Sequence, residues 1–323
     1  MGRIKMHIVA CLDSGFVMPT GVMMYSVCAN NLEVNIDFHL VVDESVTDSD
    51  KNDLVNTVCQ FKDTCINFYD ISSRLSAVFP LYKDEWLTRS TYYRLFLTEI
   101  LPKSIDKVLY LDGDCIVRKS LIPLWNTDLS ENAVGAVFDG AEGNIEYYNR
   151  LRYPPQLGYF NAGVLLINLS FWRYHNVLKL FIDYIESHSE RIKCEDQDVM
   201  NVVFQRKKVF VPAKYNVQTF FLRRVTVWDY WKHESEINEA ISDPVIVHYT
   251  TKDKPWIAYS HHPNPFSGSF YKYQDQTKWK GVRYETRNMK RRFKNFIGDS
   301  LRYMRILSPL RSIYIDVLPV DEG

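Results

Sequence analysis

Short apolar runs alternate along most of this chain with longer segments whose apolar residues recur every three to four positions. The short runs predict buried β-strands, and the longer segments predict amphipathic helices. Strands are predicted at residues 6–12, 37–42, 66–69, 107–111, 134–138, 163–168 and 245–249. Helices are predicted around residues 22–29, 54–58, 87–100, 171–187 and 195–203. This alternation is typical of an α/β fold with a mainly parallel central sheet.

Two carboxylates follow the apolar run at residues 107–111, in the sequence Asp112-Gly113-Asp114. Ligands of open α/β sheets bind at the carboxyl ends of the strands, so both acids are expected at the mouth of such a crevice. Oxygen ligands in this place suit a hard divalent cation with a phosphate on its far side. Taken alone, the motif is more often a solvated Asp-Gly turn between two strands. Other polar groups are expected at carboxyl strand ends, although each could also be a capping or turn residue: Asp13, Asp139, Asn161 and His248.

His248 and Lys254 extend this picture, because they follow the last predicted strand. A neutral imidazole nitrogen can complete a metal shell begun by two carboxylates, and mixed oxygen and nitrogen ligands favour Mn²⁺ or Mg²⁺ over a thiolate zinc site. Lys254 could then meet a phosphate as a point charge. The alternative for His248 is a core histidine that is hydrogen-bonded at a strand end.

Composition narrows the class of protein. The 323 residues are 46% hydrophobic and carry a formal net charge of zero, so no overall field indicates a nucleic-acid or membrane partner. Six cysteines are scattered without a C-x-x-C pair, and Cys11, Cys28 and Cys115 in apolar surroundings indicate a reducing compartment. No signal-peptide pattern or apolar stretch near the ~20 residues of a membrane span is present, which predicts a cytoplasmic protein.

The composition changes near Trp279, after which basic residues are interleaved with aromatic and aliphatic ones. This predicts a catalytic domain at residues 1–277 and a basic amphipathic helical extension at residues 278–323. Such a segment suits anionic lipid, here the inner face of the cytoplasmic membrane, or it packs on the body of the protein. No nucleic-acid-binding module accompanies the charge, so a nucleic-acid partner is not expected.

The ordered motifs resemble glycosyltransferase family 8 between about residues 6 and 256. The resemblance rests on Tyr110-Leu111-Asp112-Gly113-Asp114, Phe160-Asn161-Ala162-Gly163-Val164, Glu195-Asp196-Gln197-Asp198 and His248-Tyr249 with Lys254-Pro255-Trp256. It implies a GT-A fold and a retaining, metal-dependent transfer of a hexose. The implied donor is a nucleotide sugar, in bacterial members usually UDP-galactose or UDP-glucose. The implied acceptor is a glycan or glycolipid, such as lipopolysaccharide.

The resemblance also implies roles for individual residues. Asp112, Asp114 and His248 would hold Mn²⁺ (or Mg²⁺) against the donor diphosphate, which Lys254 would also contact. Asp13 is similar to a residue on the uracil and ribose side. The residues implied at the donor sugar and its phosphates are Arg94, Gly113, Asp139, Asn161, Ala162, Asp196 and Gln197. Two positions depart from the family pattern: Ser14 stands where an acid or Asn is frequent, and Thr251 where a Gly is frequent.

Retention of configuration would ordinarily involve a carboxylate nucleophile. Gln197 is a poor nucleophile, so front-face attack assisted by the leaving diphosphate is favoured, with Gln197 stabilising oxocarbenium-like charge or positioning the acceptor. Asp139 and Asp196 are the candidates for a covalent intermediate. Three other readings stay open at this point: a haloacid-dehalogenase-type phosphotransferase, an inactive GT-A scaffold that binds sugar or a partner, and a self-glucosylating protein of the glycogenin type.

Overall fold

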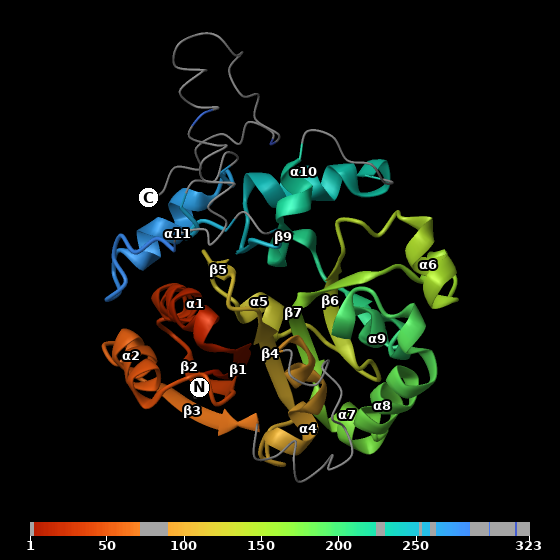
Figure 1. Ribbon diagram of the computed structural model, residues 1–323, viewed down its shortest axis with the longest axis horizontal. Helices are drawn as coiled ribbons and strands as arrows, with labels where there is room; N and C mark the ends of the chain where they lie inside the picture. The colour runs from red at the N-terminus through yellow and green to blue at the C-terminus, as the bar shows by residue number, and fades with distance from the viewer. Residues whose placement is uncertain are drawn as a thin grey trace.

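The computed structural model describes residues 3–71, 90–223, 230–251, 254–258 and 263–284, together with Ile297 and Tyr314. Two β-sheets with helices around them make up this part of the chain (Figure 1). The larger sheet has seven strands in the order β3-β2-β1-β4-β7-β6-β8. Their bounds are β1 Lys5–Leu12, β2 Asn35–Val42, β3 Thr64–Asp70, β4 Lys107–Leu111, β6 Val134–Phe138, β7 Phe160–Asn168 and β8 Lys208–Phe210.

Strand directions in the large sheet are mainly parallel, as the sequence predicts. Strands β3, β2, β1 and β4 run in one direction, and β8 is parallel to β6. Strand β7 is the exception, because it runs antiparallel to both of its neighbours, β4 and β6. Its amino end therefore lies at the same edge of the sheet as the carboxyl ends of β1, β4 and β6.

A smaller sheet stands beside this edge. Its order is β5-β10-β9, with bounds Cys115–Val117, Ile246–His248 and Val217–Gln218. Strand β10 is antiparallel to β5, and His248 pairs with Cys115 in that register. The Tyr249 amide donates a hydrogen bond to the Asp114 carbonyl oxygen at 3.0 Å. The two sheets are thus tied together at the Asp112-Gly113-Asp114 turn.

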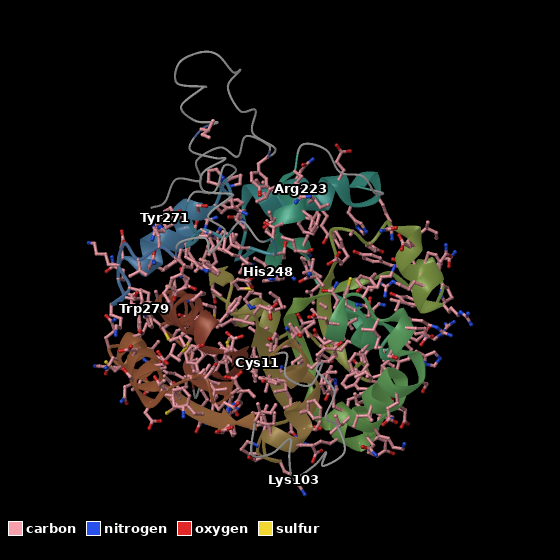
Figure 2. All side chains as sticks on the ribbon, in the orientation of Figure 1. Cys11, Lys103, Arg223, His248, Tyr271 and Trp279 are labelled. Carbon is pink, nitrogen blue, oxygen red and sulfur yellow. The ribbon has the colours of Figure 1, made fainter. Side chains whose placement is uncertain are left out.

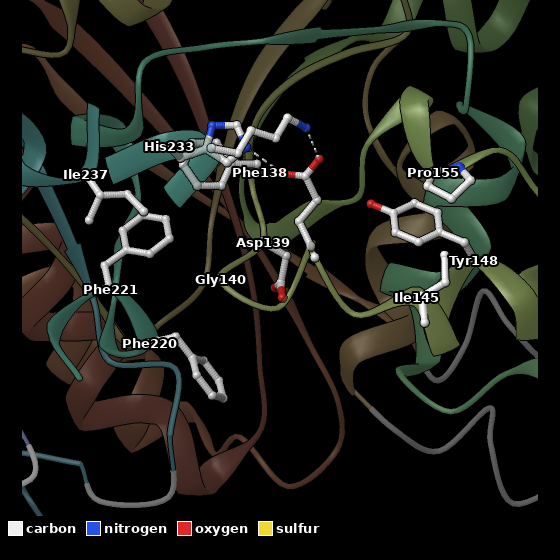
Figure 3. A pocket seen from close by; sticks show the side chains of 13 residues that line it. Phe138, Asp139, Gly140, Ile145, Tyr148, Pro155, Phe220, Phe221, His233 and Ile237 are labelled. Carbon is white, nitrogen blue, oxygen red and sulfur yellow. Dashed lines mark hydrogen bonds and ion pairs between the residues drawn. The ribbon is translucent and has the colours of Figure 1, made fainter. Parts of the chain in front are cut away.

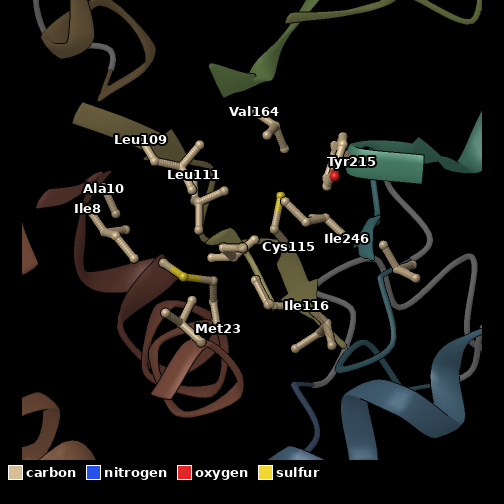
Figure 4. Packing of buried hydrophobic residues seen from close by; sticks show 14 of the residues in the cluster. Ile8, Ala10, Met23, Leu109, Leu111, Cys115, Ile116, Val164, Tyr215 and Ile246 are labelled. Carbon is tan, nitrogen blue, oxygen red and sulfur yellow. The ribbon is translucent and has the colours of Figure 1, made fainter. Parts of the chain in front are cut away.

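Helix α1 (Val17–Ala29) fills the space between the two sheets. Figure 4 shows Met23 of α1 with Ile8 and Leu109 of the large sheet and Ile116 of the small one, all of them fully buried. A helix that is covered on most sides carries no single apolar stripe, and nearly all of α1 is apolar or small. Burial of this surface, at roughly 25 cal/mol per Å², holds the small sheet onto the large one.

The opposite face of the large sheet is covered by α4, α7, α8 and α9, whose bounds are Leu97–Ile100, Leu169–Tyr174, Val177–His188 and Glu195–Val203. The single helix predicted over residues 171–187 is wrong, because Asn176 adopts a left-handed conformation (φ 47°) between α7 and α8. The helix predicted over residues 87–100 is also corrected. Ser90–Phe96 forms a 3₁₀ segment before α4, and residues 87–89 lie outside the described residues.

The remaining helices are α2 Asp48–Val58, α5 Ile122–Trp125, α6 Ile145–Leu151, α10 Glu234–Ser242 and α11 Ser267–Gln274. Thr47 and Asp50 cap α2 reciprocally, which fits the polar run at its start. In Figure 2 His248 lies near the middle of the molecule, and Trp279 lies beside α1 and α2. Among the described residues, the helices are all too short or too polar to cross a lipid bilayer.

Candidate active site

The Asp112-Gly113-Asp114 turn and the end of β10 bring three potential metal ligands together. The His248 Nε2 atom lies 3.1 Å from Asp114 Oδ1 and 3.7 Å from Asp112 Oδ2. Asp112 follows β4 in the large sheet, whereas His248 ends β10 in the small one. The contact between the two sheets therefore brings together the three residues that the sequence predicts as metal ligands.

Asp112 is held so that one oxygen faces the cluster. Its Oδ1 atom accepts hydrogen bonds from the Tyr110 hydroxyl at 2.9 Å and from Arg94 Nη2 at 3.0 Å. Tyr110 and Arg94 are buried, and the Arg94 guanidinium lies 4.3 Å from the centre of the Tyr110 ring. These two partners fix the carboxylate and leave Oδ2 directed toward His248.

The orientation of His248 depends on Asn216, a residue that sequence reasoning missed. The Asn216 side chain donates from Nδ2 to the Asn161 Oδ1 atom at 2.9 Å, so its Oδ1 atom faces His248 Nδ1 at 2.9 Å. His248 Nδ1 must then carry the proton, and Nε2 presents a lone pair to the two carboxylates. A hydrogen bond of this kind sets the tautomer and ring orientation of many metal-binding histidines.

Two observations test whether these residues suit a metal ion. The Asp114 Oδ1 atom is buried and has no hydrogen-bond partner in the described structure, although it faces His248. Burial of an oxygen atom that receives no hydrogen bond costs free energy, unless a cation binds that oxygen. Gly163 borders the same space, and a Cβ atom there would lie 2.1 Å from His248 Cε1 and 2.7 Å from Asp112 Oδ2. The residues therefore fit a hard or borderline divalent ion such as Mn²⁺ or Mg²⁺.

Cys115 lies beside the same cluster but is a poor ligand. Its Sγ atom, an Asp114 oxygen and a His248 nitrogen lie within 4.8 Å of one another. Burial and the neighbouring carboxylates raise the pKa of the Cys115 thiol well above its usual range. The thiol stays protonated, whereas metals bind the thiolate. Oxygen and nitrogen ligation is accordingly favoured over a zinc–thiolate site.

Lys254 approaches the cluster from the loop that follows β10. Its ammonium group contacts Asp114 Oδ2 and the Tyr249 carbonyl oxygen. Although burial works in the opposite direction, the neighbouring Lys254 ammonium group lowers the pKa of Asp114 below its ordinary value. Asp114 is therefore ionised at neutral pH, and a flexible cation stands next to the place where a divalent ion would bind.

A second group of polar residues lies where β6 ends and β7 begins. Asp139 Oδ2 accepts hydrogen bonds from Asn161 Nδ2 at 3.0 Å and from Gln197 Nε2 at 3.3 Å. Gln197 Oε1 in turn accepts from the Ala162 amide at 2.9 Å. Burial raises the pKa of Asp139 above its usual value. Because Asn216 also contacts Asn161, one chain of hydrogen bonds joins Asp139 to His248.

Asn161 reaches this group by a route that differs from the prediction. It lies near the amino end of β7, so the prediction that Asn161 lies at the carboxyl end of a strand is wrong. The antiparallel direction of β7 brings Asn161 to the same edge as Asp112 and Asp139. Alternation of apolar residues is the same for a strand of either direction, so the sequence pattern could not reveal this reversal.

Arg94 and Asp196 form a buried ion pair next to Asp112. Arg94 Nε lies 3.0 Å from Asp196 Oδ2, and Nη1 donates to the Ala162 carbonyl oxygen at 2.5 Å. Burial raises the pKa of Asp196 to about 7, and Asp112 contributes to that rise against the opposing effect of Arg94. One guanidinium thus orients Asp112, Asp196 and the Ala162 peptide at once.

Asp13 and Gly113 lie at the neighbouring strand ends. Asp13 follows β1, and its Oδ1 atom accepts a hydrogen bond from the Gly15 amide at 2.9 Å, which caps the short 3₁₀ segment Ser14–Phe16. A Cβ atom on Gly113 would lie 2.4 Å from Thr20 Oγ1, so the turn approaches α1 closely. All the residues predicted for the site are within the described residues, and their contacts concentrate at one edge of the large sheet.

A pocket opens beside Asp139 (Figure 3). Glu142 lies in it and accepts from Lys232 Nζ at 3.1 Å, and it contacts His233 Nε2 at 2.8 Å. The His233 ring stacks on Phe138, with centroids 3.8 Å apart. The mainly apolar remainder of the lining includes Ile145, Tyr148, Pro155, Phe220, Phe221 and Ile237. Apolar walls with a few fixed polar groups are typical of small-ligand sites.

Comparison with known proteins agrees with this geometry. The fold is the GT-A fold of glycosyltransferases: the crystal structure of the galactosyltransferase LgtC in complex with donor and acceptor sugar analogues matches with a TM-score of 0.70 and 27% identity, covering 90% of this chain and 100% of that one. The family model for glycosyl transferase family 8 matches residues 7–259. The chain belongs to glycosyl transferase family 8, as the motifs in the sequence indicate.

The chain is also similar in sequence to proteins of two bacteria. A lipopolysaccharide 1,3-galactosyltransferase of Salmonella typhimurium is 32% identical over 266 residues, which cover 80% of this chain and 75% of that protein. General stress protein A of Bacillus subtilis is 25% identical over 281 residues, covering 86% of this chain and 96% of that protein. The protein is thus a glycosyltransferase related to lipopolysaccharide galactosyl- and glucosyltransferases.

Proposed function

We propose that this glycosyltransferase moves galactose or glucose from a UDP-sugar to a glycan acceptor, with retention of configuration and with a divalent metal ion. The observation that supports the proposal most is the convergence of Asp112 Oδ2, Asp114 Oδ1 and His248 Nε2 beside the ammonium group of Lys254. Two acids, an imidazole and a lysine that meet where the two sheets adjoin suit a diphosphate and its metal ion.

Each residue has a distinct role in this proposal. Asp112, Asp114 and His248 would hold Mn²⁺ or Mg²⁺, which neutralises diphosphate charge when bound. Lys254 turns from Asp114 to the diphosphate and stabilises the charge that grows as the glycosidic bond breaks. Arg94 fixes Asp112, while Asp13, Gly113, Asn161 and Ala162 contact the remainder of the donor.

Front-face attack is the proposed route to retention. Both carboxylates near the sugar site are already engaged, Asp139 by Asn161 and Gln197 and Asp196 by Arg94. An acid that is fixed by hydrogen bonds or by an ion pair is less suited to form a covalent intermediate than a free one. Gln197, anchored to the Ala162 amide, stabilises the oxocarbenium-like sugar or positions the acceptor. The leaving diphosphate receives the acceptor proton.

The pocket beside Asp139 is the proposed entry for the acceptor, a lipopolysaccharide or other surface glycan. We expect Phe220→Ala to raise the KM for methyl galactoside or methyl glucoside roughly tenfold, about 1.4 kcal/mol, because this half-buried ring lines the pocket. Hydrolysis of the donor without acceptor should not change. Leu180→Ala, which alters an exposed side chain of α8 outside the pocket, is the control. An equal fall in hydrolysis and transfer would contradict this placement.

The basic C-terminal segment supports a peripheral location on the inner face of the cytoplasmic membrane. Lys278 pairs with Asp53 at 2.6 Å, and Arg283 contacts Gln274 and the Tyr271 ring. Lys280 is exposed, and the basic residues from Arg287 to Arg311 lie outside the described residues. The division into residues 1–277 and 278–323 stays a prediction. Binding of the full chain to vesicles that contain anionic lipid would test the membrane location.

Thermal unfolding with UDP and Mn²⁺ tests the donor site. Ligand at about 100 times its dissociation constant should stabilise the wild-type fold by roughly 2.7 kcal/mol, because it binds only the native state. The shift should require both UDP and the metal, and ADP should give a smaller one. Hydrolysis of UDP-galactose and UDP-glucose then identifies the sugar.

The outcomes also separate the competing functions. Equal shifts with UDP and ADP would contradict the uridine assignment. Binding of UDP and metal without turnover would favour the inactive scaffold, and incorporation of label into the protein itself would favour self-glucosylation. Membership of a glycosyltransferase family argues against the phosphotransferase reading, for which metal-dependent phosphatase activity would be needed.

A further inference from the structure

A second group of metal-ligating side chains lies on β1 and β2, away from the candidate active site. His7 pairs with Asp37 in the parallel register, and His39 lies two residues further along β2, so all three side chains project from the same face of the sheet. His7 Nδ1 lies 3.0 Å from His39 Nε2 and 3.7 Å from Asp37 Oδ2. One ligand atom from each lies within 4.8 Å of the others.

These separations suit a small transition-metal ion. Ligand atoms about 2 Å from a tetrahedral zinc lie about 3.3 Å from one another. The distances of 3.0 and 3.7 Å around His7 Nδ1 bracket this value. Two imidazoles and a carboxylate are also a ligand set that zinc accepts, with a water molecule in the fourth position. Little movement of the strands would be needed to receive the ion.

The surroundings hold His39 in position for binding. The Tyr69 hydroxyl, from β3, lies 2.9 Å from His39 Nδ1 and fixes the ring so that Nε2 faces His7. His39 is buried, so its ring is held between Tyr69 and His7.

We propose that His7, Asp37 and His39 form a second metal site, selective for Zn²⁺ and similar ions, that links β1 to β2. The His7 and Asp37 side chains are 21% and 17% exposed, so an ion can enter from solvent. His7 precedes Leu12, the last residue of β1, by five residues or about 17 Å, which separates this site from the one at the strand ends. Binding there stabilises the first half of the sheet rather than taking part in transfer.

Lys5 provides a diagnostic for this site. Its ammonium group lies 2.7 Å from Asp37 Oδ2, the oxygen that faces His7, and its side chain is 55% exposed. Lys5 must turn into solvent when a cation binds, because two positive charges would otherwise share one carboxylate. Lys5→Gln should therefore tighten zinc binding several-fold, whereas His39→Gln should abolish it. A non-specific surface site would respond to neither change in this way.

The experiment uses the full chain with Asp114→Asn, so that the candidate active site does not retain metal. We expect one equivalent of Zn²⁺ per chain after gel filtration, and a Co²⁺ absorption spectrum typical of tetrahedral nitrogen and oxygen ligands. Adding His39→Gln should remove both signals, and His7→Gln is the second variant if His39→Gln does not fold. Thermal unfolding without metal checks the fold of each variant.

The same titration can overturn the proposal. If the Asp114→Asn chain retains no Zn²⁺, or retains it equally after His7→Gln, the three residues form only a hydrogen-bonded histidine pair beside an Asp–Lys ion pair. If Lys5→Gln weakens binding, the site does not use Asp37 as proposed. None of these results depends on UDP or on turnover, so a failure here is distinct from a failure of the proposed transferase activity.

Discussion

Replacing Asp114 by Asn should lower kcat/KM for donor turnover at least about 10³-fold, a loss of about 4 kcal/mol in transition-state stabilisation. Asp114 Oδ1 lies 3.1 Å from His248 Nε2 and has no hydrogen-bond donor among the described residues, so a cation is its natural partner. An amide in that place removes one of the charges that hold the metal ion and also the partner of Lys254. UDP release from UDP-galactose and UDP-glucose, measured over a range of Mn²⁺ concentrations, checks this result.

A matched control is available on the surface. Asp183→Asn changes an exposed carboxylate of α8 that forms an ion pair with Lys179 at 2.8 Å. Exposed ion pairs contribute little, so the activity of this variant should stay within about twofold of wild type. If Asp114→Asn kept more than a tenth of wild-type turnover at saturating Mn²⁺, the assignment of Asp114 as a metal ligand would be untenable.

The sequence identified the three candidate ligands, but it did not identify Asn216, which orients one of them. Asp112 and Asp114 follow an apolar run directly, and His248 ends another, so strand-end reasoning alone places them at an edge. That reasoning places them in one sheet, whereas β10 belongs to the smaller sheet. The meeting of His248 with Asp114 depends on the packing of two sheets around α1, which local periodicity does not encode.

Asn216 illustrates a signal that could have been used. The run Tyr215-Asn216-Val217-Gln218 alternates apolar and polar residues, and an exposed edge strand would explain it equally well. In the structure both polar side chains are fully buried. Asn216 orients His248, and Gln218 accepts from the Gly140 amide at 2.9 Å. Only the long-range fold decides whether such an alternation faces solvent or a site.

The predicted helix boundaries are wrong for local reasons. Residues 171–187 keep a helical apolar pattern across Asn176, yet the chain turns there through a left-handed conformation that Asn tolerates better than most residues. Apolar periodicity therefore marks the buried face correctly but not the break. The reversal of β7 is a similar case, since it depends on which neighbours the strand pairs with rather than on its own sequence.

Gly163→Ala should damage the site severely, although it changes none of the candidate metal ligands. The added Cβ atom would lie 2.1 Å from His248 Cε1, 2.7 Å from Asp112 Oδ2 and 2.8 Å from His248 Nδ1. His248 cannot easily turn away, because Asn216 holds its Nδ1 atom and the ring is buried. We expect metal affinity to fall 10- to 100-fold and transfer to fall by about 10² or more, because ligand displacement by about 1 Å is costly.

Gly268→Ala is the control, since a Cβ at that position in α11 would meet no described residue within 4 Å, apart from its chain neighbours and the backbone of its own helix. It should leave activity unchanged and raise the free energy of unfolding by up to about 1 kcal/mol through helix propensity. Overpacking at Gly163 should instead cost about 1–3 kcal/mol of stability. The decisive readout is the Mn²⁺ dependence of UDP binding. If Gly163→Ala folds and needs no more Mn²⁺ than wild type, this space is not the place where the metal ion binds.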